Sequence, residues 1–307
     1  MKTCPFFGRC GGCKFDFTAP DYHDAKISTL PKLPMTDAPV WIDTGLRRRG
    51  DFCFAPGIFG LFEGGTKNII PITNCPNMAP EINAVLPALA GLPWTGAGAC
   101  LVTVCDNGVD VNITSSVPYI SPELRRAMLE LPVLRVTWND KVIFEKTKPV
   151  ISFGDKSVEY PSHAFLQPTI SGADTLRAMV VHAAHGAGRV ADLFCGLGNF
   201  TFALNADGFD VVGTGAKRDL FKHPLTVGML NTYDCVVMDP PRAGADAQCR
   251  ELVKSNVGRV IYVSCNPQTF RRDMEILTRG GYKLRTLIPV DQFVGSTHWE
   301  IFSVFEK

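Results

Sequence analysis

Short apolar runs alternate with turn-forming residues from about residue 40 to residue 160. The stretches that show this pattern are IFGLFEGG, CLVTVCDNGVDVNI, LRVTWNDKVIFEK and KPVISFGDKSVEY. In two of them the turn residues DNG and ND separate two β-rich runs, which is typical of β-hairpins. We therefore expect an antiparallel sheet in this region, with a helical insertion near residues 79–90.

A different pattern begins at about residue 161. Continuous apolar segments that end in turns predict buried strands, namely RVADLFCG, GFDVVG, YDCVVMDPP, GRVIYVSC and GYKLRTLIPV. Segments with helical spacing precede or separate them, namely SGADTLRAMVVHAAH, DAQCRELVKS and FRRDMEILTRGG. This alternation predicts an α/β fold with a parallel, doubly wound sheet. Ligands bind such sheets at the carboxyl ends of the strands, so the residues there are candidates for chemistry.

The composition is that of an ordinary globular protein, with 46% hydrophobic and 20% charged residues among 307. The net charge of +1 does not point to a nucleic-acid partner, although basic residues cluster locally at 47–49. No segment approaches the roughly 20 apolar residues that span a bilayer, and the N-terminus lacks the apolar core of a secretory signal. We expect a cytoplasmic, monomeric protein with no membrane partner.

The chain has eleven cysteines. An odd number in a chain expected to be cytoplasmic argues against a disulfide framework, so other roles must be considered. Cys4, Cys10 and Cys13 have the spacing C-x5-C-x2-C, and Cys75 offers a fourth thiolate. This clustering favours a metal site over chance. The spacing leaves zinc and an iron–sulfur cluster both open.

Cys265 ends the predicted strand GRVIYVSC and is followed by an Asn-Pro turn. A buried cysteine usually packs as a small hydrophobe, and that interpretation suits Cys235 and Cys195. It suits Cys265 poorly, because Pro267 ends the strand there. A loop cysteine at the ligand edge of the sheet is a candidate nucleophile.

Two carboxylates are candidates for the accompanying chemistry. Asp239 follows the strand YDCVVM and precedes a rigid Pro-Pro pair, so it is either a turn residue or an acid at the ligand crevice. Glu300 begins the last predicted strand, after His298. It is either an exposed edge-strand residue or a partly buried general base with a raised pKa.

Glycines in the string DLFCGLGNFT, at residues 192–201, allow a tight turn and a close approach of the backbone to a ligand. The further strings that carry chemistry-bearing residues are CPFFGRCGGC, NCPN, FLQP, DPPRAG, YVSCNPQTFRRD and THWE. Together they resemble, over most of the chain, the S-adenosylmethionine-dependent RNA 5-methyluridine (uracil-C5) methyltransferases. The cysteine strings resemble the [4Fe–4S] ligand pattern of the 23S ribosomal RNA branch, which the transfer RNA branch lacks.

The resemblance assigns roles to individual residues. It implies that Cys265 is the nucleophile and Glu300 the base. The implied [4Fe–4S] ligands are Cys4, Cys10, Cys13 and Cys75. The implied contacts to S-adenosyl-L-methionine are Gln167, Phe194, Gly196, Asn199, Asp219 and Asp239. The implied partner is RNA, with 23S rRNA favoured.

The chemistry of uracil explains these residue types. C5 of uracil is a poor nucleophile, and thiolate addition at C6 activates it for attack on a sulfonium methyl group. A base must then remove the C5 proton so that the thiol can leave. The target uridine must be unstacked to reach such a site.

The resemblance also implies the domain organisation. Residues 1–30 would form a Cys-rich cluster segment and 31–160 a β-rich RNA-binding domain in which 47–49 help to hold the RNA backbone. Residues 161–307 would form a Rossmann-like class I methyltransferase domain, shortened around 213–218. An acid that bonds the cofactor ribose is expected after the second strand. Gly213–Gly215 stand there instead, and the helix that should follow is missing.

Three alternative functions remain open from the sequence. The shortened cofactor domain favours a catalytically impaired, RNA-binding remnant of the family. A transfer RNA uridine-C5 methyltransferase would use the same chemistry. A zinc-ribbon protein would account for the cysteines alone.

Overall fold

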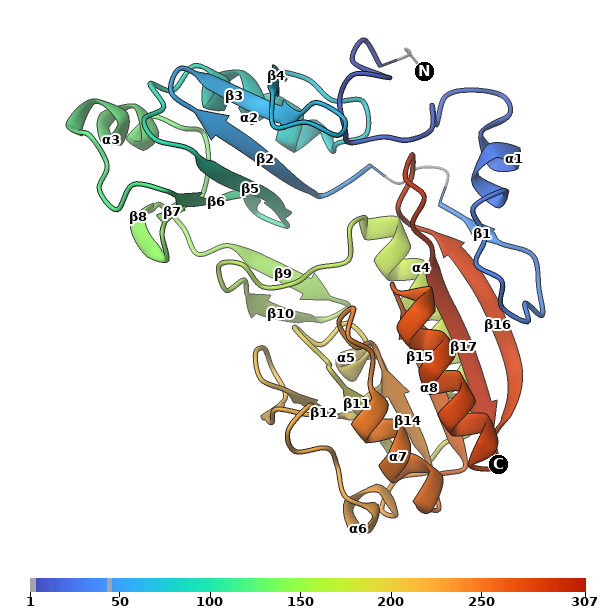
Figure 1. The fold of residues 1–307 in the computed structure, drawn as a ribbon. Helices are drawn as coiled ribbons and strands as arrows, with labels where there is room; N and C mark the ends of the chain where they lie inside the picture. Colours follow the sequence, from blue (N-terminus) through green and yellow to red (C-terminus); the bar gives the residue numbers. More distant parts are fainter. Residues whose placement is uncertain (1–3, 43–45) are drawn as a thin grey trace.

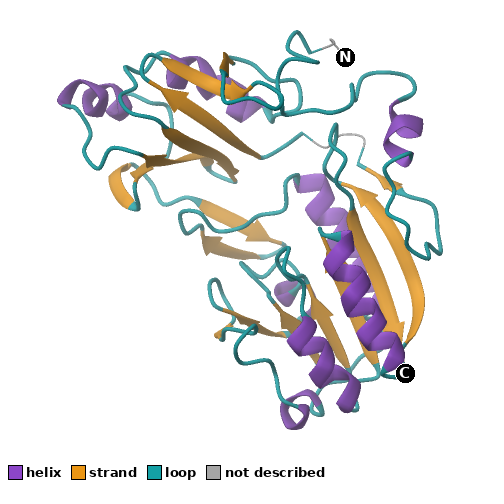
Figure 2. Cartoon of the chain, in the orientation of Figure 1, coloured by secondary structure: helices purple, strands orange, loops and turns teal. Residues whose placement is uncertain are grey.

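The computed structural model describes residues 4–42 and 46–307. It contains two large sheets, with the hairpin β9–β10 between them (Figure 1). Figure 2 shows that residues 4–39 are mostly loop and pass along the molecule from the first sheet to the second. Among the described residues, no helix is long and apolar enough to cross a membrane.

The central sheet has the strand order β4-β3-β2-β5-β6-β7-β8. Its strands are β2 (Arg49–Ala55), β3 (Ile58–Phe62), β4 (Ile69–Pro71), β5 (Gly98–Cys105), β6 (Gly108–Ser115), β7 (Arg135–Trp138) and β8 (Lys141–Glu145). Helix α2 (Pro80–Ala90) packs against β3, β5 and β6, as the expected helical insertion. Trp94 stacks on Phe54 in the core beneath it, with 4.3 Å between the ring centroids.

Both predicted hairpins are confirmed. Strands β5 and β6 meet at Cys105 and Gly108, and β7 and β8 meet at Trp138 and Lys141. The second turn needs positive φ at its two central residues, and the ND dipeptide supplies it. The prediction of a wholly antiparallel sheet is wrong, because β6 and β7 are parallel. The crossover that contains α3 (Pro122–Leu129) makes that pairing possible.

The C-terminal sheet has the order β1-β16-β17-β15-β14-β11-β12-β13. Its strands are β1 (Val40–Trp41), β11 (Val190–Leu193), β12 (Asp207–Asp210), β13 (Ala216–Lys217), β14 (Cys235–Met238), β15 (Arg259–Ser264), β16 (Lys283–Asp291) and β17 (Glu300–Glu306). Strand β17 runs antiparallel to both β15 and β16, so the predicted parallel sheet is interrupted once. The remaining pairs from β11 to β15 are parallel, as expected.

Helices cover both faces of this sheet. The remaining helices among the described residues are α1 (Tyr22–Ile27), α4 (Ile170–Ala183), α5 (Thr201–Leu204), α6 (Val227–Leu230), α7 (Asp246–Lys254) and α8 (Pro267–Arg279). Along β14, Val236 and Met238 join the core that contains residues of α7 and α8. Cys235 and Val237 join the opposite core, which contains residues of α4. Burial on both faces explains why the strands read as continuous apolar runs.

The short strand β1 pairs with β16, so the chain reaches the C-terminal sheet before it enters the central one. Residues 40–41 therefore lie with the C-terminal sheet in space, although they fall within the segment 31–160 of the sequence prediction. The two-stranded sheet of β9 (Val150–Phe153) and β10 (Lys156–Glu159) precedes α4. The domain boundaries at 30/31 and 160/161 stay a prediction.

Candidate active site

Three of the residues expected to carry chemistry lie at one edge of the C-terminal sheet. Asp239 follows β14, Cys265 follows β15, and Glu300 begins β17. These strands are neighbours in the order β17-β15-β14. Because β17 is antiparallel, its first residue lies at the edge where the parallel strands end. The register pairs Ser264 with Ile301, so Cys265 and Glu300 adjoin the last paired positions.

A chain of buried hydrogen bonds connects the two carboxylates. Gln167 Nε2 donates to Asp239 Oδ2 at 2.9 Å. Gln292 Nε2 donates to Gln167 Oε1 at 2.9 Å and also to Glu300 Oε2. Gln167, Gln292 and Glu300 are all buried. The site therefore brings Gln167 next to Asp239, while the cofactor role expected of Gln167 stays a prediction, and it includes Gln292, which sequence reasoning missed.

Gln292 could have been found by a signal already applied to Asp239. It stands at the end of the apolar segment GYKLRTLIPV, where a polar residue reaches the ligand edge of the sheet. Its Oε1 is buried and has no protein partner, and the same holds for Glu300 Oε1. Unpaired buried acceptors are costly, so these two atoms mark a place where a donor is expected to bind.

Burial dominates the electrostatics of the carboxylates. It raises the pKa of Glu300 well above the usual range; the charge of Asp239 raises that pKa further, and the hydrogen bond from Gln292 lowers it. Burial and the neighbouring Asp192 raise the pKa of Asp239 to about 7, against the effect of Gln167. Glu300 is 2% exposed, so it is not an exposed edge-strand residue. A raised pKa suits a group that exchanges protons near neutral pH.

Cys265 is half-buried at the start of helix α8, directly before the N-cap residue Asn266. Burial raises the pKa of its thiol to about 11, and the charges of Glu300 and Asp239 contribute to this rise. Arg242 acts in the opposite direction. The thiol is therefore protonated in the free protein at neutral pH. The N-terminus of α8 favours negative charge at this position, which would help the thiolate form.

The glycine loop after β11 is strongly turned. Phe194, Gly196 and Gly198 all have positive φ, at 62°, 51° and 98°. A non-glycine residue in this region costs on the order of 1–3 kcal/mol, and such strain is found at ligand sites. Asn199 Oδ1 accepts a hydrogen bond from Arg177 at 3.1 Å, while its buried Nδ2 has no protein partner.

The expectation that no acid follows the second strand is wrong. Strand β12 ends at Asp210 rather than near 213–215. Asp210 Oδ2 accepts the amide of Gly196 at 2.9 Å, and Oδ1 accepts the amides of Val211 and Val212. By binding the amides that would continue the strand, this side chain ends β12 early, although β-branched residues follow. The acid therefore joins the second strand end to the glycine loop.

The part of the chain that the structure describes contains no helix directly after β12, while the shortening of the domain stays a prediction. Residues 211–215 are bends, and no helix lies between Asp210 and β13 in this fully described segment. Val211 and Val212 are 55% and 54% exposed there. Asp219 lies after β13 and binds the amides of its own turn, at Phe221 and Lys222. These contacts are local and do not connect it to Asp239 or Glu300, so its predicted cofactor role stays a prediction.

Four cysteines, three near the N-terminus and Cys75, line one cavity of about 180 Å³; the lining residues include Cys4, Cys10, Cys13 and Cys75 together with Arg47 and Asn77. All eleven cysteines of the chain are free. Burial is the main cause of the raised pKa values of Cys10, Cys13 and Cys75, and the charges of neighbouring cysteines contribute. In the described part of the chain, no group of three or more histidine, cysteine or acidic side chains has the arrangement of a site for a single metal ion. An iron–sulfur cluster is thus not confirmed.

The arginines at 47–49 have different surroundings. Arg48 is buried and donates to the carbonyl oxygen of Val104 at 3.0 Å, so it is not available to an RNA backbone. Arg47 and Arg49 both line the cysteine cavity. Arg49 also lies over the ring of Phe165, 5.8 Å from its centroid.

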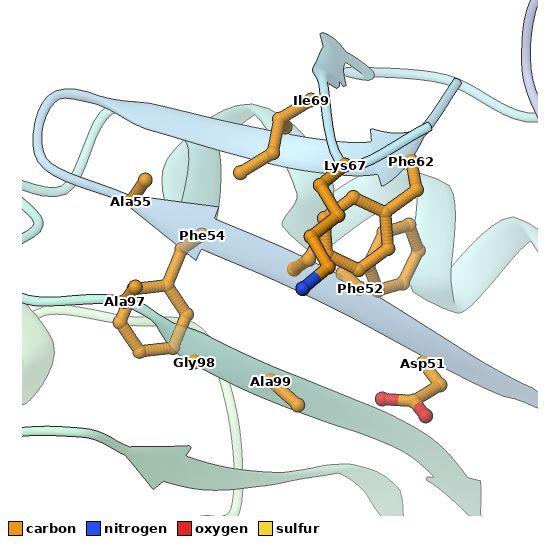
Figure 3. A pocket seen from close by; sticks show the side chains of 11 residues that line it. Asp51, Phe52, Phe54, Ala55, Phe62, Lys67, Ile69, Ala97, Gly98 and Ala99 are labelled. Carbon is orange, nitrogen blue, oxygen red and sulfur yellow. The ribbon is translucent and has the colours of Figure 1, made fainter. Parts of the chain in front are cut away.

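A larger cavity lies away from these residues, on the central sheet. It measures about 590 Å³ and is mainly apolar. Figure 3 shows the side chains of Phe54, Phe62 and Lys67 around it. None of the residues predicted to be catalytic or to bind a cofactor lines it. Size alone therefore does not identify the active site here.

Comparisons with known proteins agree with the resemblance seen in the sequence. The model of the tRNA (Uracil-5-)-methyltransferase family matches residues 216–307, which include Asp239, Cys265 and Glu300. The archaeal tRNA (uracil-54, C5)-methyltransferase of Pyrococcus abyssi, solved with S-adenosyl-L-homocysteine, has a similar fold. Its TM-score is 0.72 at 19% identity, over 88% of this chain and 78% of that one.

Similar sequences extend over nearly the whole chain. An uncharacterized RNA methyltransferase of Brucella melitensis is 35% identical over 99% of this chain and 84% of its own length. One of Agrobacterium fabrum is 32% identical over 98% and 83%. The 23S rRNA (uracil(1939)-C(5))-methyltransferase RlmD of Salmonella typhi is 26% identical over 99% and 81%.

The alignment with the Agrobacterium protein is also longer than this chain, at 346 positions against 307 residues. The relative therefore has residues within the aligned span that this chain lacks. The shared sequence and the shared fold lead to one conclusion: the chain belongs to the RNA (uracil-C5) methyltransferase family.

Proposed function

We propose that the protein methylates C5 of a uridine in 23S rRNA, using S-adenosyl-L-methionine and a covalent bond between Cys265 and C6 of the uracil. The main support is the position of Cys265 and Glu300 at adjoining ends of paired strands. Asp239 lies at the end of the next strand and is linked to Glu300 through two buried glutamines. The similarity to an enzyme named for 23S rRNA favours that RNA.

The residues divide the reaction between them. The Cys265 thiol gives up its proton to solvent and its sulfur adds to C6, and the electrons of the C5–C6 double bond make C5 nucleophilic. S-adenosyl-L-methionine supplies an electrophilic methyl group when bound. Glu300 then accepts the C5 proton, the C5–C6 double bond re-forms, and the C6–S electron pair returns to sulfur. Asp239 and Gln167, next to this path, offer an acceptor and a donor for the polar edge of the uracil.

The glycine loop is consistent with the methyl donor. Open space lies beside Gly196, where an added Cβ would meet no atom within 4 Å. The unpaired Asn199 Nδ2 can donate to a bound ligand. Phe194, held in the left-handed region at the end of β11, offers an aromatic side chain. We propose that these three residues contact S-adenosyl-L-methionine, with Gln167, Asp219 and Asp239 as further contacts.

We also propose a [4Fe–4S] cluster on Cys4, Cys10, Cys13 and Cys75. The support is that all four line one cavity of about 180 Å³. A cluster of several atoms binds cysteines that surround a space, whereas zinc needs four ligands about 2.3 Å from one point. Methyl transfer by this route moves no electrons, so the cluster would have a structural or RNA-orienting role.

The test combines the protein with labelled S-adenosyl-L-methionine and in vitro transcribed 23S rRNA, which carries no modifications. We expect label at C5 of one uridine, and no label with the Cys265→Ala variant. Transcribed tRNA in a parallel reaction tests the transfer RNA alternative. Label in tRNA alone would replace the proposed substrate, while label that persists with Cys265→Ala would contradict the covalent route.

The missing helix after β12 supports a second candidate, a remnant that binds RNA without methylating it. The remnant and the enzyme differ in whether the protein is expected to bind S-adenosyl-L-methionine. Binding of RNA by the intact protein, with neither heat on titration with S-adenosyl-L-methionine nor label in any RNA, would favour the remnant. The presence of Asp210 at the end of β12 weakens this candidate, because an acid stands at that strand end after all.

A further inference from the structure

The loop between β16 and β17 determines where Glu300 lies. It comprises residues 292–299, so Gln292 is its first residue and Glu300 directly follows its last. Both of these side chains belong to the hydrogen-bond chain of the candidate active site. Figure 1 shows the β16–β17 loop beside residues 4–39, the N-terminal segment, whose Lys26 is 272 positions from His298 in sequence.

Lys26 of α1 lies against this loop and is completely buried. Its Nζ donates to the carbonyl oxygens of Phe293, Ser296 and His298, at 3.2, 2.7 and 2.8 Å. It also forms an ion pair with Asp291 Oδ1 at 2.8 Å. One ammonium group therefore holds three backbone carbonyls of the loop and the carboxylate just before it.

The arrangement around this ammonium group is specific for a cation. Three carbonyl dipoles and one carboxylate point at Nζ, and a lysine has three N–H donors to offer. The Trp299 ring adds a cation–π contact, with its centroid 5.0 Å from Nζ. A buried positive charge is costly unless it is paired in this way, so the loop conformation and the charge of Lys26 stabilise each other.

Other residues of the N-terminal segment hold the middle of the loop. The amide of Gly295 donates to Tyr22 Oη at 3.0 Å, and Tyr22 Oη donates to Asp291 Oδ2 at 2.6 Å. The carbonyl oxygen of Gly295 accepts the amides of Lys14 and Phe15 at 2.7 and 3.0 Å. Hydrogen bonds to both the amide and the carbonyl group of Gly295 therefore hold the loop at this residue.

Asn77 adds a link to the cysteine cavity. Its Nδ2 donates to the carbonyl oxygen of Val294 at 3.0 Å and lies 3.6 Å from Cys13 Sγ. Gly295, with φ of +77°, packs so closely on Cys13 that an added Cβ would lie 3.1 Å from Sγ. The segment that carries Cys13 thus touches the loop that directly precedes the predicted base, Glu300.

We propose that Lys26 is a positioning residue for Glu300, and that the N-terminal segment holds the β16–β17 loop in the conformation needed for proton removal. This inference rests on the function proposed above. The step concerned is the last one: the C5 proton passes to a Glu300 oxygen, the C5–H electrons form the C5–C6 double bond, and the C6–S electrons leave on the Cys265 sulfur. Addition and methylation depend on the loop less directly, because Cys265 and Asp239 are on other elements and only Gln292, through Gln167, connects the loop to Asp239.

The test uses Lys26→Met in the full-length protein, with 23S rRNA transcript and S-adenosyl-L-methionine. A displaced Glu300 leaves the methylated adduct intact, so we expect a slow-migrating protein–RNA species whose decay is about 10- to 100-fold slower than in the unsubstituted protein. Hydrogen exchange gives an independent readout. Amides of residues 292–299 should exchange faster in the variant, while those of β5 and β6 remain unchanged.

Two further variants guard against simple unfolding. Lys26→Met combined with Asp291→Asn removes both buried charges and keeps an acceptor for Tyr22, so it should fold better and still accumulate the adduct. Lys32→Met, at an exposed lysine of the same segment, should behave as the unsubstituted protein does. Unfolded protein forms no adduct, so accumulation of the adduct is not explained by lost stability.

Three outcomes would overturn the proposal. Adduct decay within twofold of the unsubstituted protein in both Lys26 variants would do so, as would unchanged exchange of residues 292–299. Loss of adduct formation in both variants would show that Lys26 acts before proton removal. If the unsubstituted protein labels no RNA, the proposed function fails instead, and hydrogen exchange still decides whether Lys26 holds the loop.

Discussion

Glu300 accepts a hydrogen bond from Gln292, and neither side chain is exposed to solvent by more than 2%. The predicted base is therefore oriented by an amide that has no charge and no pKa of its own. Since the second acceptor of this amide is Gln167, the position of Glu300 is also tied to Asp239. Substitutions of Glu300, Gln292 and Asp239 should therefore differ in their effects on adduct release, on its pH dependence and on stability.

Glu300→Gln is expected to trap the enzyme on its RNA. Addition of Cys265 and methyl transfer need no base, but release does, so the methylated adduct should accumulate as a slow-migrating band on a denaturing gel. The control is Glu123→Gln, an exposed glutamate in the first turn of α3. A Glu300→Gln protein that turns over and leaves no adduct would show that another group removes the proton.

Gln292→Met should shift the pH dependence of adduct release to higher pH. The hydrogen bond from Gln292 lowers the pKa of Glu300, so its loss raises that pKa further. Only the carboxylate form accepts a proton, and a higher pKa means that this form appears at a higher pH. The rate of adduct decay, measured from pH 6 to pH 9 in steps of about half a pH unit, reports this pKa. A profile that moves to lower pH, or does not move, contradicts the assignment.

Gln292→Met should also lower the free energy of unfolding, because Gln167 Oε1 and Glu300 Oε2 would each lose a hydrogen-bond donor. Leaving a buried acceptor unpaired costs about 1–3 kcal/mol. Urea unfolding separates this loss from the change in pH dependence, since a destabilised protein with an unchanged pH profile would assign Gln292 a purely structural role.

Asp239→Asn should stabilise the free protein at alkaline pH. The folded-state pKa of about 7 lies above the ordinary value of 3.8, so folding favours the neutral acid. The stabilising contribution is fully present below about pH 4 and is lost as the pH rises through 7. At pH 8 the buried carboxylate costs up to about 4 kcal/mol, because each tenfold change in an acid dissociation constant corresponds to about 1.4 kcal/mol. Asparagine stays neutral and still accepts from Gln167.

Urea midpoints at pH 5 and pH 8 check this prediction. The difference between Asp239→Asn and the unsubstituted protein should grow with pH, while the exposed control Asp155→Asn should show no such trend. A constant difference would mean that Asp239 is ionised across the range. Methylation should nevertheless fall, because the carboxylate is expected to orient the uracil.

Sequence reasoning succeeded where a local pattern has a direct structural cause. Strands buried on both faces must be continuous and apolar, so their ends are visible as abrupt changes to polar residues, and Asp239 and Cys265 were found in this way. The ND and DNG turns and the helix at Pro80–Ala90 were visible for similar local reasons.

Sequence reasoning failed where the structure depends on contacts between residues far apart in the sequence. The bond between Gln292 and Gln167 joins residues 125 positions apart, and Lys26 meets its carbonyls about 270 positions away. The antiparallel insertion of β17 leaves no local trace either. The end of β12 was misplaced because Val211 and Val212 favour a strand, while the Asp210 side chain binds their amides and turns the chain.

The [4Fe–4S] cluster proposed on Cys4, Cys10, Cys13 and Cys75 can be tested by reconstitution. Anaerobic addition of iron and sulfide should give a brown protein with broad visible absorption, and Cys75→Ser should remove most of it, because Cys75 is the proposed ligand that lies far from the other three in sequence. Cys53→Ser, at a buried cysteine on β2 that does not line the cysteine cavity, should retain the colour. Zinc has a filled d shell and gives no colour, so a colourless protein that binds one zinc per chain would replace the cluster with a zinc site. Loss of the cluster should also speed hydrogen exchange in residues 292–299, because Asn77 and Gly295 connect the cysteine cavity to that loop.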